Sequence, residues 1–339
     1  MKDRIDEIQD RRTLDDEGLR MLLDTRDDAV VEALHERARE VAEERFGKRV
    51  YLRALIEWSN VCRNDCLYCG IRKSNRTVRR YALTREEIFA SCENAWSHGL
   101  RTFVLQGGEN PPAALELAGT VAEIRASWPE AAITLSLGEL PVETYRLLKQ
   151  SGANRYLLRH ETASPEHYAR LHPTGMRLET RIRCIQALKE LCYQTGMGMM
   201  VGSPFQTTED LIRDIRLIER IRPEMVGAGP FIPAKDTPFG NESPGSADKT
   251  LRLYSILRLM FPKLLVPATT ALSTLLPDGR RQGILAGANV IMPSFTPATR
   301  RADYALYAGK SYEELQTIER ELSAIGYAVS PSRGDYDER

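Results

Sequence analysis

The sequence lacks long apolar runs, an excess of charge of either sign and a high cysteine content. No stretch approaches the roughly 20 apolar residues of a membrane-spanning helix, and the first residues, MKDRIDEIQDRR, are too polar for a signal peptide. The 47 basic and 47 acidic residues cancel, so nothing indicates a nucleic-acid-binding or membrane-binding surface. Six cysteines in 339 residues are too few for a disulfide scaffold. We therefore expect a cytoplasmic protein with reduced thiols.

The pattern of the chain after Arg53 predicts an α/β fold. Short apolar runs alternate there with amphipathic helix patterns, and eight such alternations can be counted. Because buried parallel strands read as continuous apolar runs, we expect a (β/α)8 TIM barrel with an N-terminal helical extension. The expected strands are residues 54–58, 102–106, 133–137, 155–159, 197–201, 225–228, 264–267 and 290–292. The main expected helices are residues 84–97, 113–128, 142–150, 179–191, 208–221 and 249–260.

Three segments are expected along the chain. Residues 1–50 form a helical cap, in which Thr13 is a candidate N-cap and a second amphipathic segment runs from Asp27 to Phe46. Residues 51–311 form the barrel. Residues 312–339 supply a last helix, expected over 312–325, and a polar tail, SPSRGDYDER, that we expect to be frayed.

One loop, NVCRNDCLYCG, sets Cys62, Cys66 and Cys69 in the spacing C-x3-C-x2-C, with Tyr68 before the last cysteine. Three thiolates can ligate three irons of a [4Fe-4S] cluster, and no fourth cysteine or histidine follows closely to close the set. One iron then stays open for S-adenosylmethionine (SAM). The spacing is similar to the signature of the radical SAM superfamily.

Simpler interpretations of this loop exist. A structural zinc site needs a fourth ligand, and the nearest candidates, Cys92 and His98, lie in a predicted helix. A redox pair or a chance cluster of thiols is a further alternative. Cys92, Cys184 and Cys192 lie in apolar helical surroundings and are expected to be core residues.

Polar residues follow nearly every expected strand, at the end of the barrel where active sites gather. After the second strand, Gln106–Glu109 (QGGE) resembles the segment that binds the methionyl amino group of SAM, with an ordinary glycine turn as the alternative. Thr134 and Ser136 alternate on the third strand and so share one face. Facing inward they suit a ribose or substrate oxygen, whereas facing outward they are only solvated.

The fourth strand ends in RYLLRHET. Arg159 offers a planar fork for a carboxylate, and Glu161 can accept from an ammonium group; a surface salt bridge is the alternative. Arg181, on the next helix, is a candidate for the methionyl carboxylate, although an isolated helical arginine is more often solvated. The small residues of segment 227–233 suit the face of an adenine. The seventh and eighth strands are followed by Thr269, Thr270, Met292, Tyr304 and Tyr307.

Across nearly the whole barrel, the chain resembles the HydE family of iron-iron hydrogenase maturases. The matching segments are SNVCRNDCLYCGIR, TLSLGE, RYLLRHET, VGAGPFIPAKDTP, PATTA and GANVIMPSFTP. The related methylornithine synthase and biotin synthase families share the cluster loop and the barrel but match these stretches less well. Some HydE proteins carry further cysteines near the C-terminus for an accessory cluster, whereas here no cysteine follows Cys192, so no second cluster is expected.

The resemblance implies two cofactors, a [4Fe-4S] cluster held by Cys62, Cys66 and Cys69, and SAM. The SAM site that it implies comprises Tyr68, Gly107, Gly108, Glu109, Ser136, Glu161 and Arg181. The small anionic substrate would lie against Arg53, Thr134, Arg159, Met225, Thr269, Thr270, Met292, Tyr304 and Tyr307. No residue is assigned as an acid or base, because homolytic cleavage of SAM needs none.

The implied reaction is reductive cleavage of SAM to methionine and a 5'-deoxyadenosyl radical. The radical would act on a small cysteine-derived, iron-bound substrate during assembly of the [FeFe]-hydrogenase active-site cluster. The implied partners are a reducing electron donor and other hydrogenase maturases, but neither nucleic acid nor a membrane. The alternatives are a methylornithine-synthase-like mutase or biotin-synthase-like enzyme on the same barrel, or a non-catalytic metal-binding scaffold protein.

Overall fold

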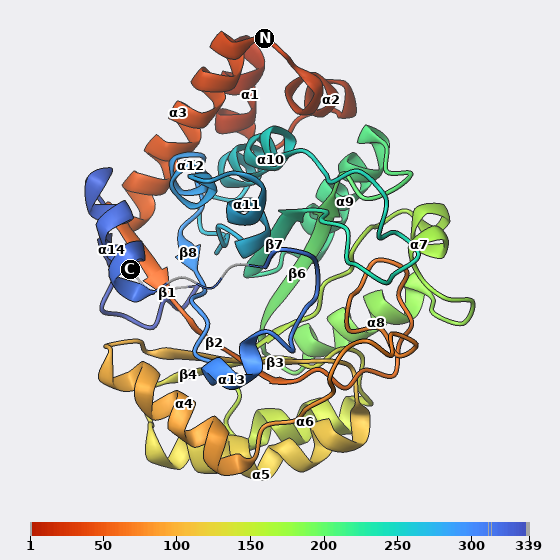
Figure 1. Ribbon diagram of the computed structural model, residues 1–339. Coiled ribbons are helices and arrows are strands. Elements are labelled where there is room, and N and C mark those ends of the chain that lie inside the picture. The colour runs from red at the N-terminus through yellow and green to blue at the C-terminus, as the bar shows by residue number, and fades with distance from the viewer. Residues whose placement is uncertain (1, 311, 313, 337–339) are drawn as a thin grey trace.

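The computed structural model describes residues 2–310, 312 and 314–336 of the chain. Six parallel strands form one sheet in the order in which they occur in the sequence (Figure 1). They are β2 (Ala54–Ser59), β3 (Thr102–Gly107), β4 (Ala132–Ser136), β5 (Arg155–Leu157), β6 (Gln194–Val201) and β7 (Met225–Pro230).

Isolated parallel bridges and one short strand complete the ring. Met225 bridges to Leu265, and Pro267 bridges to Val290 in β8 (Val290–Ile291). Ser294, just after β8, bridges to Leu55 in β2 and so returns to the first strand. β1 (Arg49–Leu52), separated from β2 only by Arg53, also pairs with β8. The predicted (β/α)8 barrel is confirmed, and all of the expected strand segments lie in it.

The helices that follow the strands lie close to their expected bounds. A capping box of Thr84 and Glu87 starts α4, and a second one of Thr207 and Asp210 starts α9. Among the described residues, every helix is too short or too polar to span a bilayer. The predicted helices are α4 (Arg85–Ser97), α5 (Pro111–Ser127), α6 (Val142–Gln150), α8 (Leu178–Glu190), α9 (Thr208–Ile221) and α10 (Ala247–Met260). The sequence reading missed α7 (Pro165–Leu171), α11 (Thr270–Leu275), α12 (Gly279–Leu285) and α13 (Ala298–Arg301).

The N-terminal segment consists of α1 (Lys2–Arg11), α2 (Asp16–Asp24) and α3 (Asp28–Phe46), which pack against α9 and α10 (Figure 1). Asp27 caps α3 as the pattern indicated. The N-cap of α2 is Asp15 rather than Thr13, because the Asp15 carboxylate accepts from the Gly18 amide at 2.7 Å. The Thr13 hydroxyl instead donates to Glu219 Oε1 at 2.6 Å, which ties this segment to α9.

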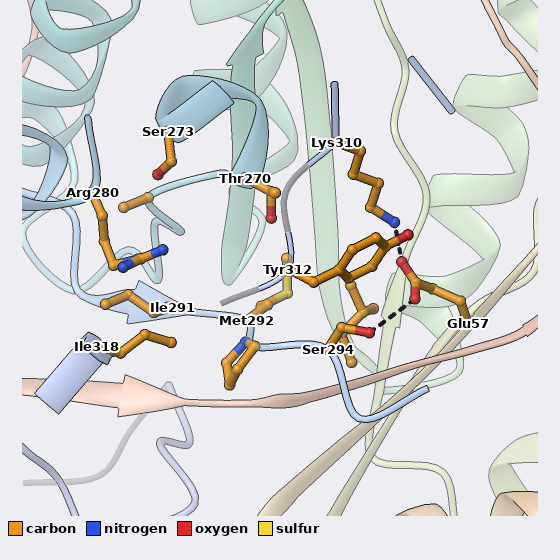
Figure 2. Close-up of a pocket in the computed structure, with 13 residues that line it drawn as sticks. Glu57, Thr270, Ser273, Arg280, Ile291, Met292, Ser294, Lys310, Tyr312 and Ile318 are labelled. Atoms are coloured by element: carbon orange, nitrogen blue, oxygen red, sulfur yellow. Dashed lines mark hydrogen bonds and ion pairs between the residues drawn. The ribbon is translucent and has the colours of Figure 1, made fainter. Parts of the chain in front are cut away.

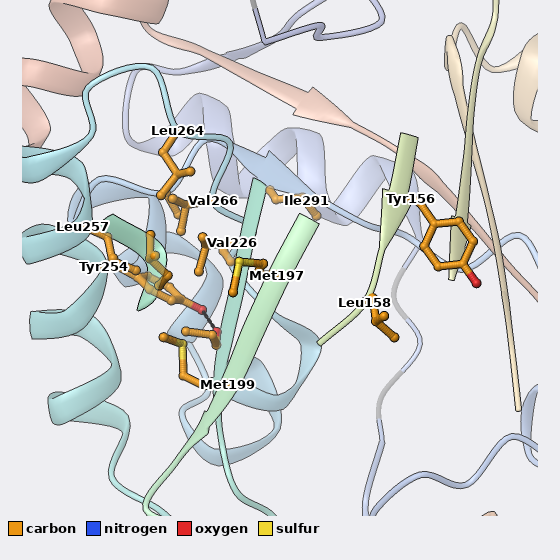
Figure 3. Packing of buried hydrophobic residues seen from close by; sticks show 14 of the residues in the cluster. Tyr156, Leu158, Met197, Met199, Val226, Tyr254, Leu257, Leu264, Val266 and Ile291 are labelled. Carbon is orange, nitrogen blue, oxygen red and sulfur yellow. Dashed lines mark hydrogen bonds between the residues drawn. The ribbon is translucent and has the colours of Figure 1, made fainter. Parts of the chain in front are cut away.

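The hydrophobic core lies between the strands and the surrounding helices (Figure 3). Met197 and Met199 on β6 are fully buried, as are Tyr254 and Leu257 on α10. The Tyr254 hydroxyl donates to the Ala228 carbonyl at 2.8 Å, so its one polar group is satisfied. Each such side chain contributes roughly 1.5–3 kcal/mol to stability by leaving water.

The C-terminal segment differs from its prediction. The last helix, α14 (Leu315–Ala324), begins later than expected; residues 311 and 313 lie outside the described part of the chain. β9 (Ala328–Val329) then pairs with β1, and the tail crosses the N-terminal ends of the barrel strands. The carbonyl of Arg333 accepts from Thr102 Oγ1 at 2.8 Å, and the carbonyl of Gly334 accepts from Arg155 Nη2 at 2.8 Å.

The expectation of a frayed tail is therefore wrong for residues 330–336. Buried guanidinium groups need hydrogen-bond acceptors, and the tail supplies them. Asp335 forms an ion pair with Arg155 at 2.6 Å, and Arg155 is fully buried. Residues 337–339 lie outside the described part of the chain.

Candidate active site

A cavity of about 320 Å³ lies at the C-terminal ends of the barrel strands. It is lined by residues from the loops after β2, β3, β4, β5, β7 and the seventh and eighth strand segments. Most of the predicted site residues line it together: Cys62, Cys66, Tyr68, Cys69, Gly107, Gly108, Glu109, Ser136, Arg159, Glu161, Arg181, Thr269, Thr270, Met292, Tyr304 and Tyr307.

The structure does not bring Arg53, Thr134 and Met225 to this cavity. Arg53 precedes β2 and Met225 starts β7, so both lie at the opposite end of the barrel. The Arg53 guanidinium donates to Met225 Sδ at 3.0 Å and to the Gly334 carbonyl at 3.4 Å. Thr134 lies deeper than Ser136 on the same face of β4, and its hydroxyl has no partner among the described residues. The prediction that Arg53 and Met225 line the substrate pocket is corrected accordingly.

The cysteine loop after β2 is held by groups that the sequence reading did not single out. The Arg80 guanidinium donates to four backbone carbonyls of the loop region, those of Asn60, Ile71, Arg72 and Asn75, at 2.5–3.0 Å. Gly70 packs so closely on a later segment that a Cβ there would lie 1.9 Å from the Ala305 carbonyl oxygen. The loop is therefore fixed from both sides before any ligand binds.

The three thiols suit a cluster better than a single ion. Burial raises the pKa of Cys62 and Cys66 and raises that of Cys69 to about 12, so each thiol holds its proton near neutral pH until a metal displaces it. Among the described residues, no group of three histidine, cysteine or acidic side chains is arranged to hold one metal ion. A [4Fe-4S] cluster takes one thiolate at each of three separate irons, so the sulfurs need not converge. Three thiols that line one cavity fit that group.

The two glycines at the end of β3, Gly107 and Gly108, serve packing. A Cβ on Gly107 would lie 2.4 Å from Trp58 Nε1, and one on Gly108 would lie 2.5 Å from the Val61 carbonyl. Gly107 therefore lets β3 approach Trp58 of β2, and Gly108 lets it approach the cysteine loop. The sequence pattern predicts contact of these glycines with a ligand, whereas the structure shows that they are also required for packing. The Glu109 amide donates to Cys62 Sγ at 3.3 Å, and its carboxylate accepts from Arg63 Nε at 2.8 Å. This segment orients the first cysteine.

Tyr68 is oriented by a histidine that the sequence reading missed. Its hydroxyl lies 3.2 Å from His172 Nε2, and the His172 ring stacks on Tyr168 at a centroid distance of 3.9 Å. His172 Nδ1 lies 2.9 Å from the Tyr168 carbonyl and so carries the ring proton, which leaves Nε2 to accept from Tyr68. Burial lowers the pKa of His172 to about 3, so the ring is neutral.

The segment after β5 holds Glu161 in a backbone conformation that costs energy. Its φ of 66° lies in the left-handed region, which costs a non-glycine residue roughly 1–3 kcal/mol. The Glu161 amide donates to the Gly198 carbonyl at 2.9 Å, and the preceding His160 is fixed by Asp214 at 3.1 Å. The fully buried Asp214 thus anchors this segment from α9.

Arg159 and Glu161 form an ion pair of 3.1 Å at the cavity wall. Arg159 Nη2 also donates to the Met199 carbonyl at 2.8 Å. Arg159 Nε has no hydrogen-bond partner among the described residues. A donor on this arginine is therefore available to a bound molecule.

Arg181 is buried, so the solvated alternative does not hold. Its Nε donates to Glu139 Oε1 at 2.5 Å, and its Nη1 donates to the Arg159 carbonyl at 2.6 Å. Burial opposes the charged form, but Tyr168, Glu139 and Glu109 together raise the pKa of Arg181 above its ordinary value. Arg181 keeps its charge and braces the loop that carries Arg159.

The far side of the cavity contains Thr269, Thr270 and Met292. Thr269 caps α11 and accepts from the Leu272 amide at 3.4 Å, so its position is set by the helix start. The Tyr304 hydroxyl lies 3.2 Å from Gln106 Nε2. Lys310 also lines this side and pairs with Glu57, and neither residue was predicted (Figure 2). The acidic residue inside the apolar strand ALIEWS was a signal that could have found them.

Comparison with known proteins identifies the family. A model of the radical SAM superfamily matches residues 56–218. The chain is also 44% identical over 302 residues to the [FeFe] hydrogenase maturase subunit HydE of Thermotoga maritima, covering 89% of this chain and 86% of that protein. The chain belongs to the HydE family of radical SAM enzymes. Its cofactors are accordingly a [4Fe-4S] cluster and SAM.

Two further relatives show how far the likeness extends. The 3-methylornithine synthase of Methanosarcina acetivorans is 30% identical over 325 residues, covering 94% of this chain and 91% of that protein. A crystal structure of methylornithine synthase superposes with a TM-score of 0.86 at 28% identity, covering 96% of this chain and 97% of the other. This HydE-family chain therefore shares its overall architecture with the methylornithine synthases.

Proposed function

We propose that this enzyme uses SAM to generate a 5'-deoxyadenosyl radical that acts on a small, anionic, cysteine-derived and iron-bound substrate during assembly of the [FeFe]-hydrogenase active-site cluster. One observation carries the proposal: the three cysteines, Arg159, Thr269 and Thr270 all line a single cavity. The kinship with the Thermotoga maritima maturase supports the substrate class.

The cysteine side of the cavity is proposed as the cofactor site. Cys62, Cys66 and Cys69 would hold the cluster. When bound, the cluster would supply the electron that reduces SAM, and SAM would supply the 5'-deoxyadenosyl radical with release of methionine. Glu161 presents a carboxylate at the cavity wall, on a backbone held in place by Gly198, and suits an ammonium group. The proposed SAM contacts are Tyr68, Gly107, Gly108, Glu109, Ser136, Glu161 and Arg181.

The walls formed after β5, after β8 and by the seventh strand segment are proposed as the substrate site. Arg159 retains an unpaired Nε–H that suits a carboxylate, and Thr269 and Thr270 add hydroxyls. Apolar walls that include Leu55, Met200 and Phe231 keep water from the reacting atoms. The proposed substrate contacts that line the cavity are Arg159, Thr269, Thr270, Met292, Tyr304 and Tyr307. No residue is proposed as an acid or base.

The wider assignment is also part of the proposal. The enzyme would take electrons from a reducing donor and act with other hydrogenase maturases. A cytoplasmic location is proposed because three ligand thiols must stay reduced before the cluster binds. Residues 1–50 are proposed as a helical extension, residues 51–311 as the catalytic barrel, and residues 312–339 as a C-terminal segment.

The test begins with anaerobic reconstitution of the full-length chain with iron and sulfide. We expect 5'-deoxyadenosine and methionine to form from SAM when dithionite is added, and Cys66→Ser to remove this activity. Zinc uptake without SAM cleavage would instead support a non-catalytic metal-binding protein. The same preparation is then given a cysteine-iron complex or L-lysine, in separate assays.

The methylornithine-synthase-type mutase is the second candidate function, favoured by the TM-score of 0.86 with that enzyme. Consumption of the cysteine-iron complex with an increase in 5'-deoxyadenosine supports the HydE-type reaction. Conversion of L-lysine, detected by mass spectrometry as an isomeric product, would support the mutase and contradict the proposed substrate.

A further inference from the structure

A small polar recess of about 30 Å³ adjoins the main cavity at the ends of β2 and β8 (Figure 2). The two spaces share four lining residues, Leu55, Thr270, Met292 and Lys310. Lys310 therefore stands where the recess meets the proposed substrate side. Lys310 reaches the main cavity from the segment after β8, whereas Arg159 and Arg181 come from the β5 and α8 region.

The Lys310 ammonium group is buried but not fully used. Its side chain is 8% exposed, and Glu57 is its hydrogen-bond partner among the described residues. An ammonium group has three N–H donors, so two are left over. The ammonium nitrogen also lies 4.8 Å from the Tyr304 ring centroid and 5.1 Å from that of Tyr312, which restricts where it can move.

Glu57 is an anchor that does not depend on Lys310. The carboxylate is fully buried and accepts from Ser294 Oγ at 3.0 Å and from Thr296 Oγ1 at 2.6 Å. The Glu57 amide also donates to Thr296 Oγ1 at 2.8 Å. With the carboxylate held by two hydroxyls beyond β8, the ammonium group that pairs with it has a defined position.

The strand order places Lys310 and Arg159 on opposite walls. Around the ring, β2 is followed by β3 to β7, then by residues 264–267 and β8, so β8 lies half a ring away from β5. Arg159 follows β5, whereas Lys310 is held against β2 and the segment after β8. Both residues line the same cavity. Arg159 Nε has no partner among the described residues, and the Lys310 ammonium group has N–H donors beyond the one given to Glu57. A small molecule between them is contacted at both ends.

We propose that Lys310, positioned by Glu57, binds the end of the substrate that lies away from Arg159. This inference rests on the proposed function of the cavity. It narrows the substrate class to small molecules with a carboxylate at one end and a second anionic or strongly accepting group at the other. Lys310 already pairs with Glu57, and Arg159 already pairs with Glu161. The two cations therefore select the substrate by directional hydrogen bonds as well as by charge.

The experiment compares two probes of the same amino-acid type on the reconstituted, SAM-loaded full-length enzyme. L-Aspartate has the second carboxylate and L-alanine lacks it, and isothermal titration calorimetry under anaerobic conditions gives both dissociation constants. We expect the wild type to bind aspartate at least ~10-fold more tightly than alanine, since charge-assisted hydrogen bonds are worth that much. Arg159→Met should weaken both probes.

The decisive variant is the double change Lys310→Met with Glu57→Gln, because removing Lys310 alone would leave a buried carboxylate without its cation. Glu57→Gln alone is the matched control, since it retains Lys310 and the contacts to Ser294 and Thr296. The double variant should lose the preference for aspartate while its alanine affinity stays within about twofold. Lys310→Arg, with Glu57 unchanged, should retain most of the preference for aspartate, because it keeps a cation at this position.

Two results would overturn the proposal: equal affinity of the wild type for the two probes, or an unchanged preference in the double variant. If the ion pair of Lys310 and Glu57 were purely structural, its removal would lower the melting temperature and weaken the binding of both probes alike. Reductive SAM cleavage by the wild type is measured in the same preparation. Its absence would remove the proposed function, whereas its presence with no preference for aspartate overturns only the role of Lys310.

Discussion

Arg155 and Arg159 lie four residues apart on the same side of one strand and its continuation, yet their surroundings are opposite. Arg155 is fully buried and donates to Gln194, Thr102, two carbonyls of the C-terminal tail and Asp335. The Arg159 side chain is 34% exposed and keeps an unpaired Nε at the cavity. One end of the barrel interior is thus filled by the chain itself, and the other has donors left for a ligand.

The difference shows that the position of an inward-facing arginine along the strand decides its role. Near the N-terminal end of the barrel it stabilises the fold, and near the C-terminal end it can bind a ligand. At the N-terminal end, the carbonyls of Arg333 and Gly334 accept hydrogen bonds from the guanidinium groups of Arg155 and Arg53, so the chain itself occupies this end of the barrel. At the C-terminal end, the loops carry cysteines, hydroxyls and acidic groups around an open volume. Changes at the first end should therefore affect stability, and changes at the second should affect chemistry.

The largest effect is expected at the open end, for Cys69→Ser. Loss of one thiolate should reduce 5'-deoxyadenosine formation by more than ~100-fold, because a ligand contributes more than the groups that only orient it. The metal-free variant should melt within a few degrees of the wild type, since the thiol is neutral there. Cys192 is exposed, so the expectation that it is a core residue is wrong, and Cys192→Ser is the control that should keep full activity. Half of the wild-type rate in Cys69→Ser would contradict the ligand assignment.

The next effect is expected at the filled end, for Arg155→Met. Removing this buried cation takes one ion pair from Asp335 and one donor from each of the two tail carbonyls, which should lower the free energy of unfolding by roughly 3–5 kcal/mol. Urea denaturation measures the change. Arg146→Met, which breaks an exposed pair with Glu143, should change it by less than about 1 kcal/mol. Equal effects of the two variants would show that the tail does not seal this end.

Arg159→Met tests the comparison with Arg155 directly, because it removes a guanidinium group from the C-terminal end of the barrel instead of the N-terminal end. We expect the affinity for L-cysteine, measured by calorimetry, to fall by about 10–100-fold with the loss of a charge-assisted contact. The free energy of unfolding should fall by much less than in Arg155→Met, since the Arg159 side chain is partly solvated. A larger loss of stability than in Arg155→Met would reverse the assignment of the two ends.

The smallest effect is a pH dependence at the filled end. Burial works to raise the pKa of Asp335, but the charges of Arg155 and Arg333 outweigh it and lower that pKa below its ordinary value. The carboxylate therefore stabilises the fold above its ordinary pKa of about 3.9, and this contribution disappears as the pH falls through the lowered value.

Asp335→Asn should accordingly be less stable than the wild type at pH 7, with a difference in melting temperature that shrinks on acidification. Thermal unfolding of both proteins from pH 7 to pH 3 measures the difference. A difference that grows toward acid would mean that the carboxylate is not paired in the folded state.

The strands and the cysteine loop could be predicted because their signals are local. An apolar run such as ITL, bounded by turns, predicts a buried strand wherever it occurs, and the thiol spacing of Cys62, Cys66 and Cys69 is a property of one loop. The resemblance of RYLLRHET and the other segments to one family made it possible to predict most of the residues that line the cavity.

The misplaced and missed residues depend on tertiary structure. Arg53 and Met225 lie at strand starts, but their height matters only once the barrel closes. The tail looked frayed because it is polar, whereas its polar backbone is what two buried arginines require. His172 contacts Tyr68 across 104 sequence positions, and Arg80 folds back on backbone carbonyls 5 to 20 residues before it, so no residue pattern marked either contact.

The path of the C-terminal tail has a consequence for the order in which this protein takes shape during synthesis. β2 to β7 pair in the order in which they are made, so they can assemble as the chain emerges from the ribosome. Arg53 and Arg155 must stay hydrated until residues 333–335 arrive to accept their hydrogen bonds. The tail therefore closes the N-terminal end of the barrel late in folding. Iron can be loaded at the cysteines of the opposite end after the chain has been completed.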